Sequence, residues 1–284
     1  MSGTLQVRAP RGLFSVTPLE PFGALVDIDL REPLNAGQQE EMRALRLQHQ
    51  LLLFRGQRLS MAEQERVMRY FGPIVTDPTD RLEYVSRDHP KGQLGDGRLT
   101  FHIDLLFTTD PLLGLALHAL EVDEGMTSTD FASCRDAYRR LPEELKQKLF
   151  GLQAVHCLAP DPEGCARDQS PPAFFPRALH QLVTPHPVSG EKLLWASEQQ
   201  TEYITGLPRG ESDALLDGLY AYLYAPENRH SHSWRTGDIV IWDNLSLQHG
   251  RPTVPDCRRT LQRATGGERG IFEIVPHLRG AKLW

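Results

Sequence analysis

The sequence contains no apolar run near the roughly 18 residues that a membrane-spanning helix needs, and its first eight residues lack the apolar stretch of a signal peptide. Cysteine is also scarce. Cys134, Cys157, Cys165 and Cys257 are the four thiols among 284 residues, and no two of them form a CxxC pair. This pattern favours neither a disulfide framework nor a cysteine zinc site. We therefore expect a cytoplasmic protein with reduced cysteines.

The chain has no excess of basic residues either. It carries 31 lysines and arginines against 37 acidic residues, which gives a formal net charge of -6. A broad nucleic-acid or anionic-membrane surface needs clustered Lys and Arg, so neither is expected as a partner. The expected partner is a small-molecule substrate, and self-association into a homo-oligomer stays open.

Hydrophobic spacing and end signals predict both helices and strands. Helical patterns cover 35–49, 60–71, 136–149 and 212–223. Runs of strand length cover 24–30, 50–55, 112–122, 238–242, 259–265 and 270–275. Asn35 is a good N-cap for the first helix, and Ser60 with Glu63 forms a capping box for the second. Without a repeat or a linker, the sequence predicts one α+β domain over residues 1–284 with a mainly β core.

Two long segments, 75–100 and 159–176, are broken by proline and glycine and show no periodic pattern. Structureless segments of this length in a compact domain are usually functional. We expect both to shape the active site as loops or lids.

His102 and Asp104 form an HxD pair, and in an extended strand positions i and i+2 point to the same face. His249, which follows the predicted strand 238–242, is the candidate third member. Two His and one Asp match the facial triad that holds iron(II) with open coordination positions. Zinc would fit the same atoms, so the metal stays open at this point.

Arg259 and Arg263 are four residues apart on one predicted strand, so both point to the same face, whereas Arg258 points away. Two guanidinium groups directed into a β core need anions to pair with. We therefore expect an anionic ligand in the β core near the metal, and this expectation is the observation that separates the iron and zinc interpretations.

These residues, taken in order with several shorter motifs, resemble the taurine dioxygenase-like (TauD/TfdA) family of iron(II)- and 2-oxoglutarate-dependent oxygenases. The resemblance runs through nearly the whole chain. It includes Phe22-Gly23-Ala24, Leu53-Phe54-Arg55-Gly56-Gln57 with Leu59-Ser60, Phe71-Gly72, His102-Ile103-Asp104, His186-Pro187 with Gly190-Glu191-Lys192, Trp234-Arg235-Thr236-Gly237-Asp238, Trp242-Asp243-Asn244, His249 and the segment 259–265.

The resemblance implies a double-stranded β-helix, the jelly roll of cupin-like proteins, with flanking helices. It also implies that His102, Asp104 and His249 hold Fe(II), with 2-oxoglutarate and O2 as cosubstrates. The expected reaction decarboxylates 2-oxoglutarate to succinate and CO2 and oxidises a substrate C–H bond, usually to a hydroxyl. Related halogenases lack the carboxylate at the position of Asp104, so halogenation is not expected.

Further residues carry roles by the same resemblance. Arg259 would pair with the distal carboxylate of 2-oxoglutarate, and Thr129 matches the threonine that bonds the same carboxylate. The Gly-Gly pair usual before that threonine is Met126-Thr127 here, which makes Thr127 a rival. Arg263 matches an arginine that faces the prime substrate. Phe101 replaces the tryptophan common before the HxD pair, a change near the pocket that makes it a candidate substrate contact.

The prime substrate is expected to be small and anionic, with a carboxylate, sulfonate or sulfate positioned by Arg263. The competing interpretation gives Arg263 an internal salt bridge to an acidic residue such as Asp96 or Glu121. Two other functions are alternatives. A non-catalytic β-barrel binding protein predicts a damaged triad, and a zinc hydrolase has no need of Arg259 inside the barrel.

The other histidines are expected to be structural or exposed. Apolar or strand-like neighbours predict structural roles for His118, His156 and His180. Polar or turn neighbours predict surface positions for His89, His186, His230, His232 and His277.

Overall fold

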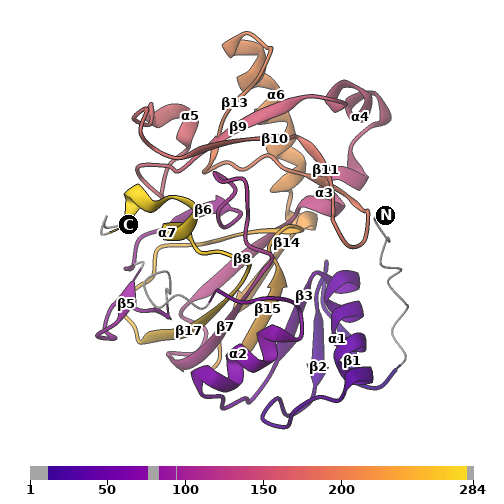
Figure 1. The fold of residues 1–284 in the computed structure, drawn as a ribbon, viewed down its shortest axis with the longest axis vertical. Coiled ribbons are helices and arrows are strands. Elements are labelled where there is room, and N and C mark those ends of the chain that lie inside the picture. Colours follow the sequence, from indigo (N-terminus) through magenta and orange to yellow (C-terminus); the bar gives the residue numbers. More distant parts are fainter. Residues whose placement is uncertain (1–11, 76–82, 94, 280–284) are drawn as a thin grey trace.

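The computed structural model describes residues 12–75, 83–93 and 95–279, and two sheets face each other in it (Figure 1). The larger sheet has the strand order β1-β2-β3-β15-β7-β17-β4-β5. Its strands are β1 (Ser15–Pro18), β2 (Ala24–Asp27), β3 (Leu51–Phe54), β4 (Tyr84–Val85), β5 (Gly92–Gln93), β7 (Gly114–Val122), β15 (Ile239–Asp243) and β17 (Arg259–Gly266). The smaller sheet has the order β14-β8-β16-β6. It consists of β6 (Leu99–His102), β8 (Ser128–Ser133), β14 (Arg229–Ser233) and β16 (Leu247–Arg251).

The space between these sheets is filled by apolar side chains from both. Leu117 and Leu261 from the larger sheet belong to one buried cluster with Phe131 and Leu247 from the smaller one. Each such side chain contributes roughly 1.5–3 kcal/mol on burial. The predicted jelly roll is therefore confirmed, and its interior is a packed core.

Two N-terminal helices cover the outer face of the larger sheet. They are α1 (Ala36–His49) and α2 (Met61–Arg69), and both begin at the predicted capping residues, Asn35 and Ser60. Met42 and Met68 are buried in one cluster with Ala116 of β7. Because neighbouring Leu117 faces the other sheet, β7 is buried on both faces, which explains its continuous apolar run.

The middle of the chain builds the upper half of Figure 1, on the other side of the smaller sheet. A three-stranded sheet has the order β10-β9-β13, and β11 pairs with β12. These strands are β9 (Gln153–Cys157), β10 (Arg177–Gln181), β11 (Val183–Pro185), β12 (Lys192–Leu194) and β13 (Thr201–Ile204). The helices here are α3 (Cys134–Arg140), α4 (Glu143–Leu149), α5 (Ala166–Gln169), α6 (Arg209–Leu223) and the 3-10 turn η2 (Pro226–Asn228).

Two predicted elements differ from the structure. The predicted helix over 136–149 is two helices, because Pro142 cannot donate a backbone hydrogen bond and disfavours helical geometry in the residue before it. The predicted strand over 270–275 is wrong, since α7 (Ile271–Ile274) and η3 (Pro276–Leu278) occupy that segment. The helical turn packs Ile271 against a cluster that contains Leu105 and Phe107, without any strand to pair with among the described residues.

The four cysteines are free thiols, as predicted from their number and spacing. None of the helices in the described ranges is long and apolar enough to cross a membrane.

Candidate metal and cosubstrate site

His102 and His249 lie on neighbouring strands of the smaller sheet. β6 ends at His102 and pairs antiparallel with β16 in a register that sets His249 opposite it. Directly opposed residues of a sheet project to the same face, and the two ring centroids are 4.2 Å apart. Strand pairing thus brings together two imidazoles that are far apart in the sequence.

Asp104 reaches the same point from a turn. The strand ends at His102, so the expectation of one extended HxD strand is corrected. The side chain of Asn244 accepts a hydrogen bond from the backbone N–H of Asp104 at 3.1 Å. It also donates to the carbonyls of Asp104, at 3.1 Å, and Leu112, at 2.8 Å. Leu105 then turns the chain with a left-handed φ of 62°.

The three side chains form one group of potential ligands. Asp104 Oδ1 lies 3.3 Å from His102 Nε2 and 3.9 Å from His249 Nε2. One ligand atom of each residue lies within 4.8 Å of the others, and no second group of this kind occurs in the part of the chain that the structure describes. Two imidazole nitrogens and one carboxylate oxygen are a donor set that fits iron(II).

Hydrogen bonding and burial leave these ligand atoms with lone pairs that a cation can bind. The carbonyl of Thr100 accepts a hydrogen bond from His102 Nδ1 at 2.9 Å, which leaves Nε2 as the atom with the lone pair. Burial, with His102 and Arg263 nearby, lowers the pKa of His249 to about 3. Burial alone would raise the pKa of Asp104, but Arg263 and the two imidazoles outweigh it and hold this pKa far below its usual range. Near pH 7 the group offers a carboxylate and a neutral His249.

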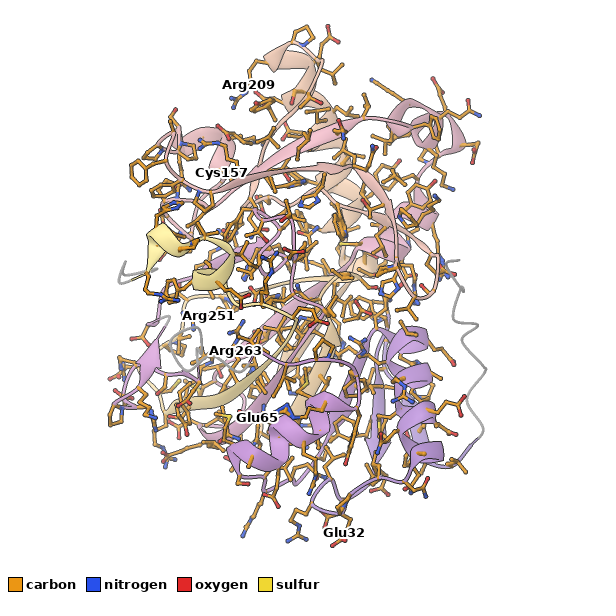
Figure 2. All side chains as sticks on the ribbon, in the orientation of Figure 1. Glu32, Glu65, Cys157, Arg209, Arg251 and Arg263 are labelled. Atoms are coloured by element: carbon orange, nitrogen blue, oxygen red, sulfur yellow. The ribbon has the colours of Figure 1, made fainter. Side chains whose placement is uncertain are left out.

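Arg263 contacts this group, and it is labelled near the middle of the view in Figure 2. Its Nη2 donates to Asp104 Oδ2 at 2.5 Å. The competing interpretation, an internal salt bridge of Arg263, is therefore right in kind. The two acids named as examples are not the partner, because Asp96 pairs with Arg87 and Glu121 with Arg258. Sequence spacing could not reveal the Asp104 pair, since the turn after β6 sets it.

Arg259 is the first residue of β17, four positions before Arg263, and is only 7% exposed. It faces the same interior as Arg263, because their partners on β7, Val122 and Leu117, both belong to the core between the sheets. Its Nε is buried and has no hydrogen-bond partner among the described residues. Burial and nearby Arg251 lower the pKa of Arg259 to about 9. A buried guanidinium of this kind favours an anionic ligand.

Thr129 and Thr127 are both buried near the start of β8. Thr129 Oγ1 accepts a hydrogen bond from Trp234 Nε1 at 3.0 Å. Thr127 Oγ1 has no partner among the described residues. The roles of both stay predictions.

Phe101 lies beside His102 on β6, where alternation directs neighbouring side chains to opposite faces. Its ring stacks on Tyr224 at a centroid distance of 4.8 Å, and the Tyr224 hydroxyl donates to Gln248, the neighbour of His249. Phe101 therefore packs behind the strands that carry the two imidazoles. Its predicted contact with substrate stays a prediction.

The predicted lid over 159–176 touches the site's supporting strand. Thr100, two residues before His102, donates its backbone N–H to Pro162 and its hydroxyl to Glu163, at 3.0 and 2.8 Å. In the other predicted loop, 75–100, residues 76–82 and 94 lie outside the described ranges. Two glycines of this loop, Gly95 and Gly97, accept hydrogen bonds through their carbonyls from the side chain of Arg251.

Sequence reasoning gave no role to Asn244 and misplaced two histidines. His186 is buried and lies 3.0 Å from Asp243, and His232 is buried and lies 3.1 Å from Asp238. Polar neighbours in the sequence suggested surface positions for both. The acidic partner of His186 is 57 positions away, and that of His232 follows in the turn between β14 and β15.

Comparison with known proteins supplies the context of this site. The model of the family described as "Taurine catabolism dioxygenase TauD, TfdA family" matches residues 15–265. An alpha-ketoglutarate-dependent 2,4-dichlorophenoxyacetate dioxygenase from Cupriavidus pinatubonensis is 31% identical over 280 residues, which cover 87% of this chain and 96% of that protein. An alpha-ketoglutarate-dependent sulfate ester dioxygenase from Pseudomonas putida is 28% identical, with 88% of each chain covered.

A crystal structure of AAD-2 in complex with Mn(II) and N-oxalylglycine superposes with a TM-score of 0.73 and 26% identity, covering 91% of this chain and 98% of that one. The chain therefore belongs to the TauD/TfdA family. It is an Fe(II)- and 2-oxoglutarate-dependent dioxygenase, and the zinc hydrolase and the non-catalytic binding protein are set aside.

Proposed function

We propose that this dioxygenase hydroxylates a C–H bond of a small anionic substrate and releases succinate and CO2. Fe(II) is held by His102, Asp104 and His249. The observation that carries the proposal is the approach of their ligand atoms to within 4.8 Å, with Asp104 ionised and His249 neutral near pH 7. When bound, the metal supplies the redox and dioxygen chemistry.

The distal carboxylate of 2-oxoglutarate is assigned to Arg259 and Thr129. Support comes from the burial of both side chains and from the unpartnered Nε of Arg259 among the described residues. A carboxylate there gains charge-assisted hydrogen bonds in a partly desolvated site. Asn244 contributes by fixing the backbone on both sides of the Asp104 side chain.

Arg263 is assigned to the anionic group of the prime substrate. One guanidinium nitrogen, Nη2, bonds Asp104, so the planar fork still has other N–H groups to offer. The relatives named above act on 2,4-dichlorophenoxyacetate and on sulfate esters, which are anions. An aryloxy or alkyl carboxylate, or a sulfate or sulfonate of similar size, is the proposed substrate class.

A succinate-release screen tests this assignment. Iron-loaded protein with 2-oxoglutarate is given aryloxyacetates, alkyl sulfates and alkyl sulfonates, each beside a neutral amide or alcohol of matched shape. We expect at least one anion to raise succinate release above the uncoupled background while its neutral counterpart does not. A neutral compound that performs as well as its anionic match would refute the charge requirement.

Arg263→Gln then tests the residue. The KM for the anion should rise about tenfold or more, from loss of a charge-assisted contact, while the KM for 2-oxoglutarate stays near wild type. Because Arg263 also contacts Asp104, Mn(II) affinity is measured in parallel. Arg258→Gln, whose side chain is 66% exposed, is the matched control. A variant that lowers only the melting temperature contradicts the substrate role.

A further inference from the structure

The hydroxyl of Thr129 receives a hydrogen bond that fixes how it can act. Thr129 is 3% exposed, and its Oγ1 accepts from the indole Nε1 of Trp234, which is fully buried, at 3.0 Å. An indole N–H can only donate, whereas a threonine hydroxyl has one proton to give and two lone pairs. The tryptophan therefore occupies a lone pair and leaves the proton of Thr129 to be given elsewhere.

No described residue accepts that proton in a hydrogen bond. A buried hydroxyl with an unused proton is costly, so a site of this kind favours an acceptor that arrives from outside the chain. A carboxylate can only accept hydrogen bonds, so it is attracted to a hydroxyl that donates its proton and repelled by one that turns its lone pairs toward it. The indole N–H thus selects the orientation of the Thr129 hydroxyl that suits an anion.

We propose that Trp234 is a positioning residue for the cosubstrate: it orients the Thr129 hydroxyl so that the proton is given to the distal carboxylate of 2-oxoglutarate. This inference rests on the proposed role of Thr129. It assigns Trp234 a role beyond packing, and it identifies Thr129 rather than Thr127 as the threonine that contacts the carboxylate.

The register of β8 supports the choice of Thr129. Phe131 pairs with His249 across the sheet, and Thr129 lies two residues further along the same face, about 7 Å away at the usual rise per residue. Thr127 comes before the first residue of β8 and is two residues further than Thr129 along the chain from the position opposite His249. A five-carbon diacid with one end near the two imidazoles spans the shorter distance only.

The indole is itself held on several sides. The backbone N–H of Trp234 donates to the Thr127 carbonyl at 3.2 Å, and the His232 ring packs edge-on at a centroid distance of 4.6 Å. His232 in turn lies 3.1 Å from Asp238, which also bonds Arg55. These contacts fix the direction of the indole N–H before any ligand binds, so little ordering is left for the binding step.

A double-mutant cycle tests the inference, with the affinity of Mn(II)-loaded protein for 2-oxoglutarate and for N-oxalylglycine measured by titration calorimetry. Thr129→Val removes the hydroxyl and should weaken binding about tenfold or more. Trp234→Phe removes the N–H but keeps a ring and should weaken it about threefold to tenfold. The double variant should bind as Thr129→Val does, because the tryptophan acts through the hydroxyl.

Trp195→Phe is the matched control. It also loses a buried indole hydrogen bond, of 3.0 Å to the Leu245 carbonyl, and should leave the affinity for 2-oxoglutarate unchanged. Losses that multiply in the double variant, or a Trp234→Phe variant that binds like wild type while Thr129→Val does not, would overturn the role of Trp234. Unchanged affinity in Thr129→Val would instead refute the proposed contact of Thr129.

A second measurement does not depend on the folding of Trp234→Phe. The chain has four tryptophans, whose indole 15N–1H resonances can be assigned by substituting the other three. Adding 2-oxoglutarate should shift the Trp234 resonance in wild type, because a hydroxyl that donates to an anion becomes a better acceptor. The shift should vanish in Thr129→Val. A Trp234 resonance that moves neither on addition of 2-oxoglutarate nor on the Thr129→Val substitution contradicts the inference.

Discussion

Replacing Arg259 with alanine should raise the dissociation constant for 2-oxoglutarate at least about 30-fold. The guanidinium is 7% exposed, and its Nε is buried without a partner among the described residues. Truncating one side of such a charge-assisted pair costs on the order of 2–5 kcal/mol, and about 1.4 kcal/mol corresponds to a factor of ten. Arg259→Lys should recover little, because an ammonium lacks the planar fork that binds both carboxylate oxygens.

Calorimetric titration of Mn(II)-loaded protein with 2-oxoglutarate measures this change without turnover. Arg258→Ala, at the residue just before β17, is the control. Its side chain is 66% exposed and pairs with Asp123 and Glu121, so this variant should bind 2-oxoglutarate as tightly as wild type. Mn(II) affinity should be unaffected in both variants, because neither arginine contacts the three metal-binding candidates. An Arg259→Ala variant with wild-type affinity for 2-oxoglutarate would refute the reasoning.

Three further predictions follow from individual contacts. Asn244→Ala should weaken Mn(II) binding about tenfold, because the backbone of Asp104 loses its side-chain support; equal Mn(II) affinity would contradict this. Phe101→Ala should lower the melting temperature through loss of the Tyr224 stack, and the predicted substrate contact requires that the KM for substrate also rises; an unchanged KM would contradict that contact. Burial lowers the pKa of His156 to about 3, below the unfolded value of 6.5. The free energy of unfolding should therefore keep its full value above pH 6.5 and decrease as the pH falls from 6.5 to 3. That loss is about 2 kcal/mol at pH 5, and denaturation of His156→Gln should show a flatter acid limb.

Local signals in the sequence were enough for much of the fold. The capping residues Asn35 and Ser60 start helices where predicted, and the apolar segment before Phe54 is a buried strand. Strand alternation also placed Arg259 and Arg263 on one face. These predictions succeeded because caps and periodicity act within a few residues.

Contacts between distant segments could not be predicted in the same way. The partner of Arg263 is Asp104, 159 positions away, and the turn that brings them together depends on Asn244. His186 lies among turn residues in the sequence, yet it is buried because Asp243, 57 positions away, pairs with it. Residue spacing does not indicate which distant residues come into contact, so the partners of these buried polar groups are known only from the tertiary structure.

The most direct test of the central claim is iron binding by Asp104→Ala. Under anaerobic conditions, wild-type protein should bind one equivalent of Fe(II) and develop a weak visible charge-transfer band when 2-oxoglutarate is added. Asp104→Ala should remain folded and lose most of the Fe(II) affinity and the band, whereas the control His118→Gln, a buried histidine bonded to the Gln57 carbonyl, should keep both. Wild-type iron affinity and an unchanged band in Asp104→Ala would contradict the account.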